Sequence, residues 1–144
     1  VWGDPAFYDS TLRILDRIAD RGRLTFDVQV LPGISALQVL AARHRLVLHE
    51  IGATITVTTG RRLGEVVASG ADNVVVMLNS DLPLEGLEDW HIWWGGNLGD
   101  VGETLVSGRV GDVLADLRQA RERLRAEHGW VMDVYLLRRV ESDS

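Results

Sequence analysis

Asn73-Val74-Val75-Val76-Met77-Leu78 is the segment that decides the fold class. Its residues are almost purely apolar, as expected of a strand that is buried on both faces of a helix-covered sheet. A β-branched run at residues 55–59 predicts a strand before it, and the segment 60–68 between the two predicts a helix. The order strand, helix, strand indicates an α/β or α+β protein.

The residues that follow continue this alternation. Strands are predicted over residues 90–94, 103–110 and 132–137. Before the last strand, residues 111–124 predict the clearest helix, because apolar residues recur at helical spacing and face inward, while Arg and Glu face outward. We therefore expect a mixed-sheet α/β domain over residues 51–144.

Residues 1–50 are expected to be the end of a separate N-terminal α/β domain. A helix is predicted over residues 10–19 with Ser10 or Asp9 as its cap, a strand over residues 26–31 from their alternating pattern, and a short apolar helix over residues 36–42. The chain opens on Val1-Trp2, which has the composition of the tail of a strand, so we expect these residues to be a piece of a longer protein.

The composition argues against several classes of function. A net charge of −6 argues against a nucleic-acid partner. The chain has no Cys, which excludes disulfides and thiolate metal sites. His44 and His49 do not share a helical face, so no metal site is predicted. No apolar run approaches the roughly 20 residues of a membrane span and no signal peptide is visible, so we expect no membrane partner and a cytoplasmic location.

Three glycine-containing loops are candidates for ligand contact, at residues 3–5, 32–35 and 95–99. Glycine lets the backbone approach a ligand closely, although each loop by itself is more often an ordinary turn. The sequence contains no nucleotide-phosphate motif and no recognisable catalytic set. It therefore predicts no catalytic residue.

Gly3-Asp4-Pro5-Ala6-Phe7-Tyr8 resembles the Gly-Asp-Pro-x-x-Tyr motif of the tetrapyrrole (corrin/porphyrin) methylase family. Leu31-Pro32-Gly33-Ile34-Ser35 follows at a similar spacing and resembles that family's Pro-Gly-Ile/Val-Ser segment. Residues 8–13, 40–44, 58–63 and 127–139 resemble one branch of the family, which acts in cobalamin biosynthesis. The resemblance covers nearly the whole chain.

The resemblance implies a tetrapyrrole methylase-like fold of two α/β domains, with S-adenosylmethionine and a tetrapyrrole bound in the cleft between them, and a homodimer. The implied substrate is precorrin-5, which is methylated with loss of acetate; the group that activates the water for this loss stays unknown. The residues implied in cofactor binding are Trp2, Gly3, Asp4, Phe7, Ser35, Ala36, Leu78, Asn97, Leu98 and Gly99.

The sequence departs from the family pattern in two places. The family's opening Gly-x-Gly-Pro-Gly segment, with the strands and helices that follow it, is absent, and Ala36 stands where a second Ser is common. We therefore expect the 144 residues alone to be inactive and at best weak binders of the cofactor.

Several side chains keep two interpretations. Asp4 could accept hydrogen bonds from the cofactor or cap the following helix. Arg61 and Arg62 could pair with carboxylates of the substrate or be solvated at a helix start. The tryptophans of residues 90–94 could stack on a flat macrocycle, although a core or interface role is favoured for at least two of them.

Two other functions also stay open. The protein could methylate another tetrapyrrole, or it could be a non-catalytic α/β interaction domain.

Overall fold

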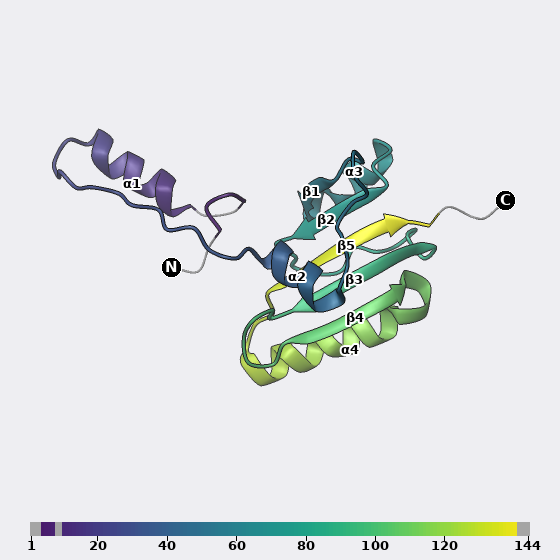
Figure 1. The fold of residues 1–144 in the computed structure, drawn as a ribbon. Helices are drawn as coiled ribbons and strands as arrows, with labels where there is room; N and C mark the ends of the chain where they lie inside the picture. Colours follow the sequence, from purple (N-terminus) through teal and green to yellow (C-terminus); the bar gives the residue numbers. More distant parts are fainter. Residues whose placement is uncertain (1–3, 8–9, 141–144) are drawn as a thin grey trace. The chain divides into compact units, whose positions relative to one another are not determined.

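The computed structural model describes residues 4–7 and 10–140 (Figure 1). The chain divides into two compact units, residues 1–35 and residues 36–144. The boundary expected between residues 50 and 51 concerns the longer two-domain fold and stays a prediction.

Within its described residues, the first unit contains one helix, α1 (Thr11–Asp20), which confirms the helix predicted there. Ser10 occupies the N-cap position, but its side chain makes no capping hydrogen bond; Asp9 lies outside the described residues. The helix stops where Gly22 takes a left-handed backbone (φ +63°), which glycine adopts without steric cost. None of the residues of α1 is buried, so this unit stabilises its helix with little apolar packing.

The predicted strand at residues 26–31 is wrong, because residues 24–35 have no regular secondary structure. Phe26, Val28 and Val30, which make up its apolar side, are 37–49% exposed. A strand needs a neighbour to take up its backbone hydrogen bonds, and the described part of this unit supplies none. The alternating pattern of these residues therefore indicates a preference for strand structure, but no described strand of this unit pairs with them.

The second unit is built on a mixed five-stranded sheet, which confirms the expected α/β class. The order is β1-β2-β5-β3-β4; β1 pairs with β2 in parallel, and the other neighbours are antiparallel. The bounds are β1 (Thr56–Thr59), β2 (Asn73–Met77), β3 (Trp90–Gly96), β4 (Thr104–Arg109) and β5 (Asp133–Arg139). β3 extends two residues past its predicted end, so Gly95 and Gly96 belong to the strand and not to a loop.

Helices cover both faces of this sheet (Figure 1). α2 (Ala36–His44) contacts β3 and β5 on one face, and α4 (Val110–His128) contacts β3 and β4 on the other. The short η1 (Gly60–Arg62) and α3 (Leu63–Ala68) follow β1. α4 begins at Val110, one residue before its predicted start, and Gly129 (φ +77°) ends it.

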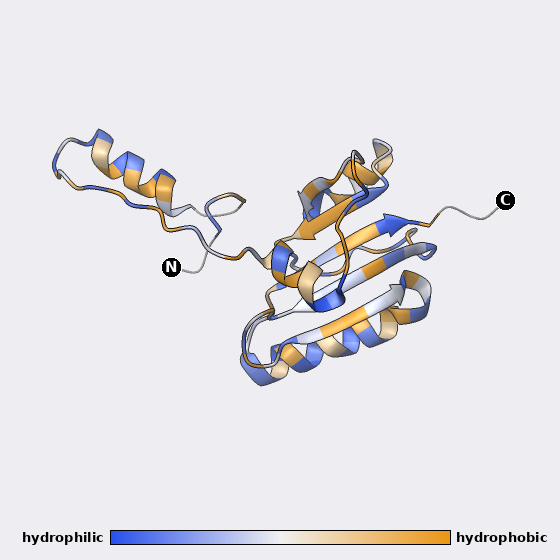
Figure 2. Cartoon of the chain, viewed as in Figure 1, coloured by the Kyte–Doolittle hydropathy of each residue, from blue (hydrophilic) through white to orange (hydrophobic). Residues whose placement is uncertain are grey.

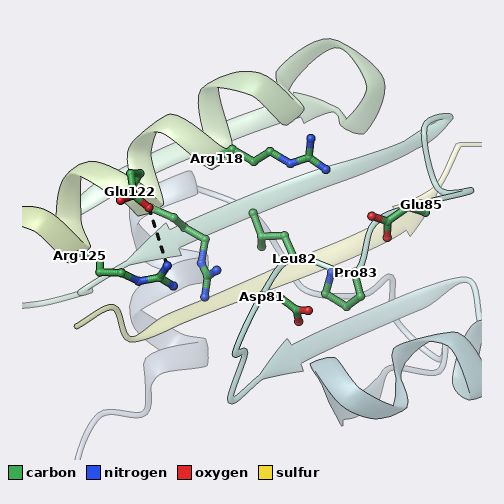
Figure 3. Close-up of a pocket in the computed structure, with 8 residues that line it drawn as sticks. Asp81, Leu82, Pro83, Glu85, Arg118, Glu122 and Arg125 are labelled. Carbon is green, nitrogen blue, oxygen red and sulfur yellow. Dashed lines mark ion pairs between the residues drawn. The ribbon is translucent and has the colours of Figure 1, made fainter. Parts of the chain in front are cut away.

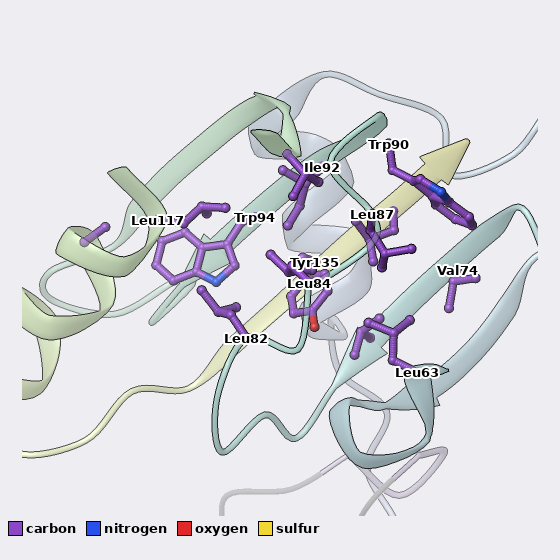
Figure 4. Packing of buried hydrophobic residues seen from close by; sticks show 14 of the residues in the cluster. Leu63, Val74, Leu82, Leu84, Leu87, Trp90, Ile92, Trp94, Leu117 and Tyr135 are labelled. Carbon is purple, nitrogen blue, oxygen red and sulfur yellow. The ribbon is translucent and has the colours of Figure 1, made fainter. Parts of the chain in front are cut away.

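The hydrophobic core lies between α4, the loop over residues 82–87 and one face of the sheet (Figure 4). Figure 2 shows hydrophobic residues along the central strands and hydrophilic ones along much of α4. The largest fully buried side chains of this core include Trp94, Tyr135, Leu117 and Leu124. Trp90 and Trp94 are buried, which confirms the core role favoured for two of the three tryptophans.

The segment that connects α2 to β1, residues 45–53, is irregular and is tied to the sheet by polar contacts. Arg138 Nη2 donates to the carbonyls of Val47 (3.1 Å) and Leu48 (2.8 Å), and Arg138 Nε donates to Asn73 Oδ1 (3.0 Å). Asn73 Nδ2 donates to the same Leu48 carbonyl (2.9 Å). These bonds fasten the segment to the start of β2 and the end of β5.

Candidate functional site

The strand pairing brings five chain segments to one end of the sheet, which we call the carboxyl end. Met77 at the end of β2 pairs with Thr59 at the end of β1. Gly96 at the end of β3 pairs with Asp133 and Thr104, which begin β5 and β4. Ligands of α/β proteins usually bind beyond the carboxyl ends of parallel strands, so this end is the candidate site.

Leu78 follows β2 directly at this end and has an unusual backbone. Its φ is +54°, in the left-handed region, and its side chain is 50% exposed. For a residue with a Cβ this conformation costs about 1–2 kcal/mol. Such strain is found preferentially at functional sites, which agrees with the cofactor contact that the resemblance implies for Leu78.

The loop after β3 is the second element of the carboxyl end. Asn97 is buried with φ +49°; its backbone N donates to the Met132 carbonyl (2.7 Å), and its Oδ1 accepts from Met132 N (2.9 Å). Leu98 packs over Gly95, where an added Cβ would lie 2.6 Å from the leucine side chain. The loop therefore has a fixed path before it reaches Gly99.

Glu103 holds the far side of this loop. Its Oε2 accepts from Gly99 N (2.6 Å) and its Oε1 accepts from Arg43 Nε (2.6 Å). The hydrogen bond from Gly99 and then the one from Arg43 lower the pKa of Glu103 below its ordinary value, since both stabilise the carboxylate. Gly99 itself has φ +77°, which suits glycine.

A buried carboxylate, Asp133, lies at the centre of the carboxyl end. Its Oδ2 accepts from Trp94 Nε1 (2.9 Å) and Arg121 Nε (2.8 Å), and its Oδ1 accepts from Asn79 Nδ2 (3.1 Å). Burial raises the pKa of Asp133, while Arg121, Trp94 and Asn79 oppose that rise. The group is completely enclosed, since its side chain has no exposed area. It links β5, β3, α4 and the segment after β2.

This network was not predicted from the sequence. The Arg residues of α4 were expected to face outward, and for Arg121 this prediction is wrong. Arg121 is buried on the same helical stripe as Leu117, Ala120 and Leu124. The helical spacing of Arg121 from these apolar residues could have revealed from the sequence that Arg121 is buried. A charged residue on a buried helical stripe requires a partner of opposite charge, which Asp133 supplies.

A pocket of about 380 Å³ adjoins this network between α4 and residues 81–85 (Figure 3). Its lining includes three arginines of α4 and carboxylates from both elements, among them the pair Arg125–Glu122 (3.8 Å). The lining mixes both signs of charge, so the pocket does not select an anion or a cation. Its lining residues are Asp81, Leu82, Pro83, Glu85, Arg118, Arg121, Glu122 and Arg125.

The remaining predicted residues fall in different places. Arg61 and Arg62 lie in η1 at the carboxyl end and are exposed; Arg62 pairs with Glu65 (3.1 Å). Ala36 begins α2 and is partly buried. The positions of Arg61, Arg62 and Ala36 do not distinguish a binding role from an ordinary structural role, so their predicted binding roles stay predictions.

Three predicted residues belong to the described part of the first unit. Asp4 Oδ1 accepts from Ala6 N (2.9 Å), which gives this carboxylate a turn-stabilising role. Phe7 is exposed, and Ser35 precedes α2. Trp2 and Gly3 lie outside the described residues. Their implied role in cofactor binding stays a prediction.

Neither a metal cluster nor a membrane helix is found in the described residues. They contain no group of three His, Cys, Asp or Glu side chains able to hold a metal ion. Within the same residues, no helix is both long and apolar enough to cross a bilayer.

Known proteins provide the context for this site. The family model for tetrapyrrole (corrin/porphyrin) methylases matches residues 1–113. A curated precorrin-6A synthase (deacetylating) from Sinorhizobium sp is 44% identical over 141 residues, which are 96% of this chain and 54% of that protein. The chain thus spans about half the length of this relative.

Solved structures that are similar include the following two. The putative cobalamin synthesis related protein (CobF) from Corynebacterium diphtheriae has a TM-score of 0.89 and 43% identity, over 98% of this chain and 60% of that one. The cobalt precorrin-4 methyltransferase CbiF has a TM-score of 0.67 and 19% identity, over 95% of this chain and 61% of that one, and shares the fold.

Proposed function

Because the chain belongs to the tetrapyrrole methylase family, we propose that it acts in an S-adenosylmethionine-dependent C-methyltransferase that converts precorrin-5 to precorrin-6A with release of acetate. The observation that carries this proposal is the identity with a curated precorrin-6A synthase, which extends over nearly the whole chain. We further propose a cytoplasmic homodimer that takes a tetrapyrrole as substrate and uses no nucleic-acid or membrane partner.

The carboxyl end of the sheet fits the cofactor chemically. S-adenosylmethionine carries an apolar-faced base, a ribose and a sulfonium, so it needs apolar surface and backbone polar groups more than a charged side-chain cluster. Leu78 offers exposed apolar surface there, and the loop of residues 97–99 offers backbone groups on a fixed path. Together with Ala36, these are the residues of the second unit that would hold the cofactor.

Methyl transfer from a sulfonium is an in-line displacement in which the cofactor supplies the methyl group and the protein supplies position. Removal of an acetyl group as acetate also consumes one water. The chain's own residues are expected to bind, to orient and to exclude bulk water. Arg61 and Arg62 would pair with carboxylates of the tetrapyrrole, since guanidinium matches carboxylate in geometry.

We expect the full-length protein to methylate precorrin-5 and to release acetate in equal amount. The measurement is the absorbance change with a panel of precorrins, together with an acetate assay. Methylation of a different tetrapyrrole would point to another branch of the family. No binding of S-adenosylhomocysteine by calorimetry would favour a non-catalytic interaction domain.

Two glycines allow a matched test of the loop after β3. Gly99 (φ +77°) and Gly86 (φ +78°) have the same backbone and no heavy atom within 4 Å of an added Cβ, but only Gly99 lies at the carboxyl end. Val at either position should cost about 1–2 kcal/mol of stability, because the left-handed backbone is strained with a Cβ. We expect only Gly99→Val to weaken binding of S-adenosylhomocysteine in calorimetry. Equal affinity of the two variants would remove residues 97–99 from the cofactor site.

A further inference from the structure

Leu78 holds a backbone conformation that its own side chain disfavours. Asn97, at the same end of the sheet, is also left-handed, but Asn tolerates this conformation far better than Leu. A strained residue persists only where the surrounding structure fixes it. The contacts of the next residue, Asn79, show what fixes Leu78.

Asn79 is held through both its side chain and its backbone. Its Nδ2 donates to Oδ1 (3.1 Å) and to the carbonyl (3.3 Å) of Asp133, and its own carbonyl accepts from Arg121 Nη2 (3.2 Å). Its side chain also lies against Gly60, where an added Cβ would be 2.7 Å from Asn79 Oδ1. The residue that follows Leu78 thus has little freedom to turn.

Asp133, to which Asn79 is hydrogen-bonded, is itself held firmly in place. Asp133 also accepts from Arg121 Nε and Trp94 Nε1, so its carboxylate is fixed from α4 and from β3. Charge-assisted hydrogen bonds in a buried place are strong and directional. The position of Asn79 is therefore set by three elements of the core.

Stability alone does not explain an Asn at this position. Its Oδ1 is buried and has no hydrogen-bond partner among the residues that the structure describes. A buried acceptor without a partner is costly, and each such group in a native protein calls for an explanation. A role in shaping the neighbouring Leu78 provides one.

We propose that Asn79 is a positioning residue of the cofactor site: anchored on Asp133 and Arg121, it holds Leu78 in the left-handed conformation that presents this side chain to S-adenosylmethionine. The inference rests on the proposed function, in which Leu78 contacts the cofactor. Asn79 itself touches no reacting atom and acts through Leu78.

The test compares two asparagines of the same strand region. Asn79 follows the carboxyl end of β2, and Asn73 begins the opposite end, where its amide bonds Leu48 and Arg138. In the full-length protein, Asn79→Ala should raise the Kd of S-adenosylhomocysteine about tenfold, because a competent conformation populated about tenfold less weakens binding by the same factor. Asn73→Ala should lose similar stability but keep its Kd within about twofold.

The kinetic readout separates positioning from mere stability. We expect the KM for S-adenosylmethionine to rise in Asn79→Ala by more than kcat falls, and both constants to stay near wild type in Asn73→Ala. Should Asn79→Ala fail to fold, Gly60→Ala replaces it, since the new Cβ displaces the Asn79 side chain without removing its hydrogen-bonding groups. Its control is Gly64→Ala in α3, where the added Cβ meets nothing within 4 Å.

The outcomes distinguish this inference from the function on which it rests. A wild-type protein that binds no S-adenosylhomocysteine contradicts the proposed function. A wild type that binds, with Asn79→Ala or Gly60→Ala binding equally well, overturns the positioning role and leaves the function standing. Equal weakening by Asn73→Ala and Asn79→Ala would also overturn it, because the effect would then reflect stability alone.

Discussion

Trp94→Ala is expected to lower the free energy of unfolding of the second unit by about 3–5 kcal/mol, the usual range for removing a buried large aromatic side chain. Trp94 has no exposed area and lies in the core among residues of α4 and β5 (Figure 4). Its ring also fills the space over Gly96, where an added Cβ would be 2.5 Å from it. The surrounding core side chains project from packed strands and a helix, so they can fill the cavity only in part.

The same substitution removes the Trp94 hydrogen bond to Asp133, which leaves a buried carboxylate with one donor fewer. The measurement is urea denaturation followed by far-UV circular dichroism. Trp130→Ala is the control, since this tryptophan is 42% exposed, and it should cost much less. A loss below about 1 kcal/mol for Trp94→Ala would contradict the described core.

Arg121→Met by itself is expected to lower the free energy of unfolding by about 3–5 kcal/mol, because it leaves the Asp133 carboxylate buried without its positively charged partner. Methionine keeps much of the side-chain volume, so the loss reports on the charge and not on a cavity. Arg118→Met, one turn earlier on the exposed side of α4, is the matched control and should change stability by no more than about 0.5 kcal/mol.

This penalty should depend on pH in a defined direction. Burial already raises the pKa of Asp133, and loss of Arg121 removes the main influence that opposes the rise. A carboxyl group whose pKa is higher in the folded than in the unfolded state binds its proton more tightly when folded, so it favours folding below that pKa and disfavours it above. The variant should thus recover stability relative to wild type as the pH falls from about 7 toward the ordinary Asp range near 3.9.

Adding Asp133→Asn to Arg121→Met removes both charges and serves as the control for this pH effect. The double variant should lose the recovery at low pH. Urea titrations at several pH values measure it. A pH-independent penalty in the single variant would show that Asp133 is not the group responsible.

The sequence predicted the elements whose signal is local. The burial of the β2 valines and of the apolar stripe of α4 can be read from the sequence, because the periodicity of a strand or helix fixes which of its residues share a face. The segment 26–31 shows the limit of that method, since a period-2 pattern becomes a strand only when another strand pairs with it.

The candidate site was predicted only in part, for a related reason. The resemblance pointed to Leu78 and residues 97–99, which the fold brings to one end of the sheet. The buried network joins Asn79, Trp94, Arg121 and Asp133 from four separate segments, and no local pattern connects them. The left-handed backbone of Leu78 could not be predicted from the sequence either. A glycine or asparagine usually occupies such a position, and a leucine gives no indication of it.

β5, which follows the other four strands of the sheet in the chain, occupies the middle of the sheet between β2 and β3. During synthesis on a ribosome, β1 with β2 and β3 with β4 can pair as two separate couples, and β5 can pair with both couples only after residues 133–139 have left the exit tunnel. The final fold of the second unit is therefore expected to form late and in one step, with long-range pairing that slows it. Until then the edge of β2 that faces β5 has no strand partner, and an unpaired strand edge favours association with other chains, so a chaperone would matter most in this interval.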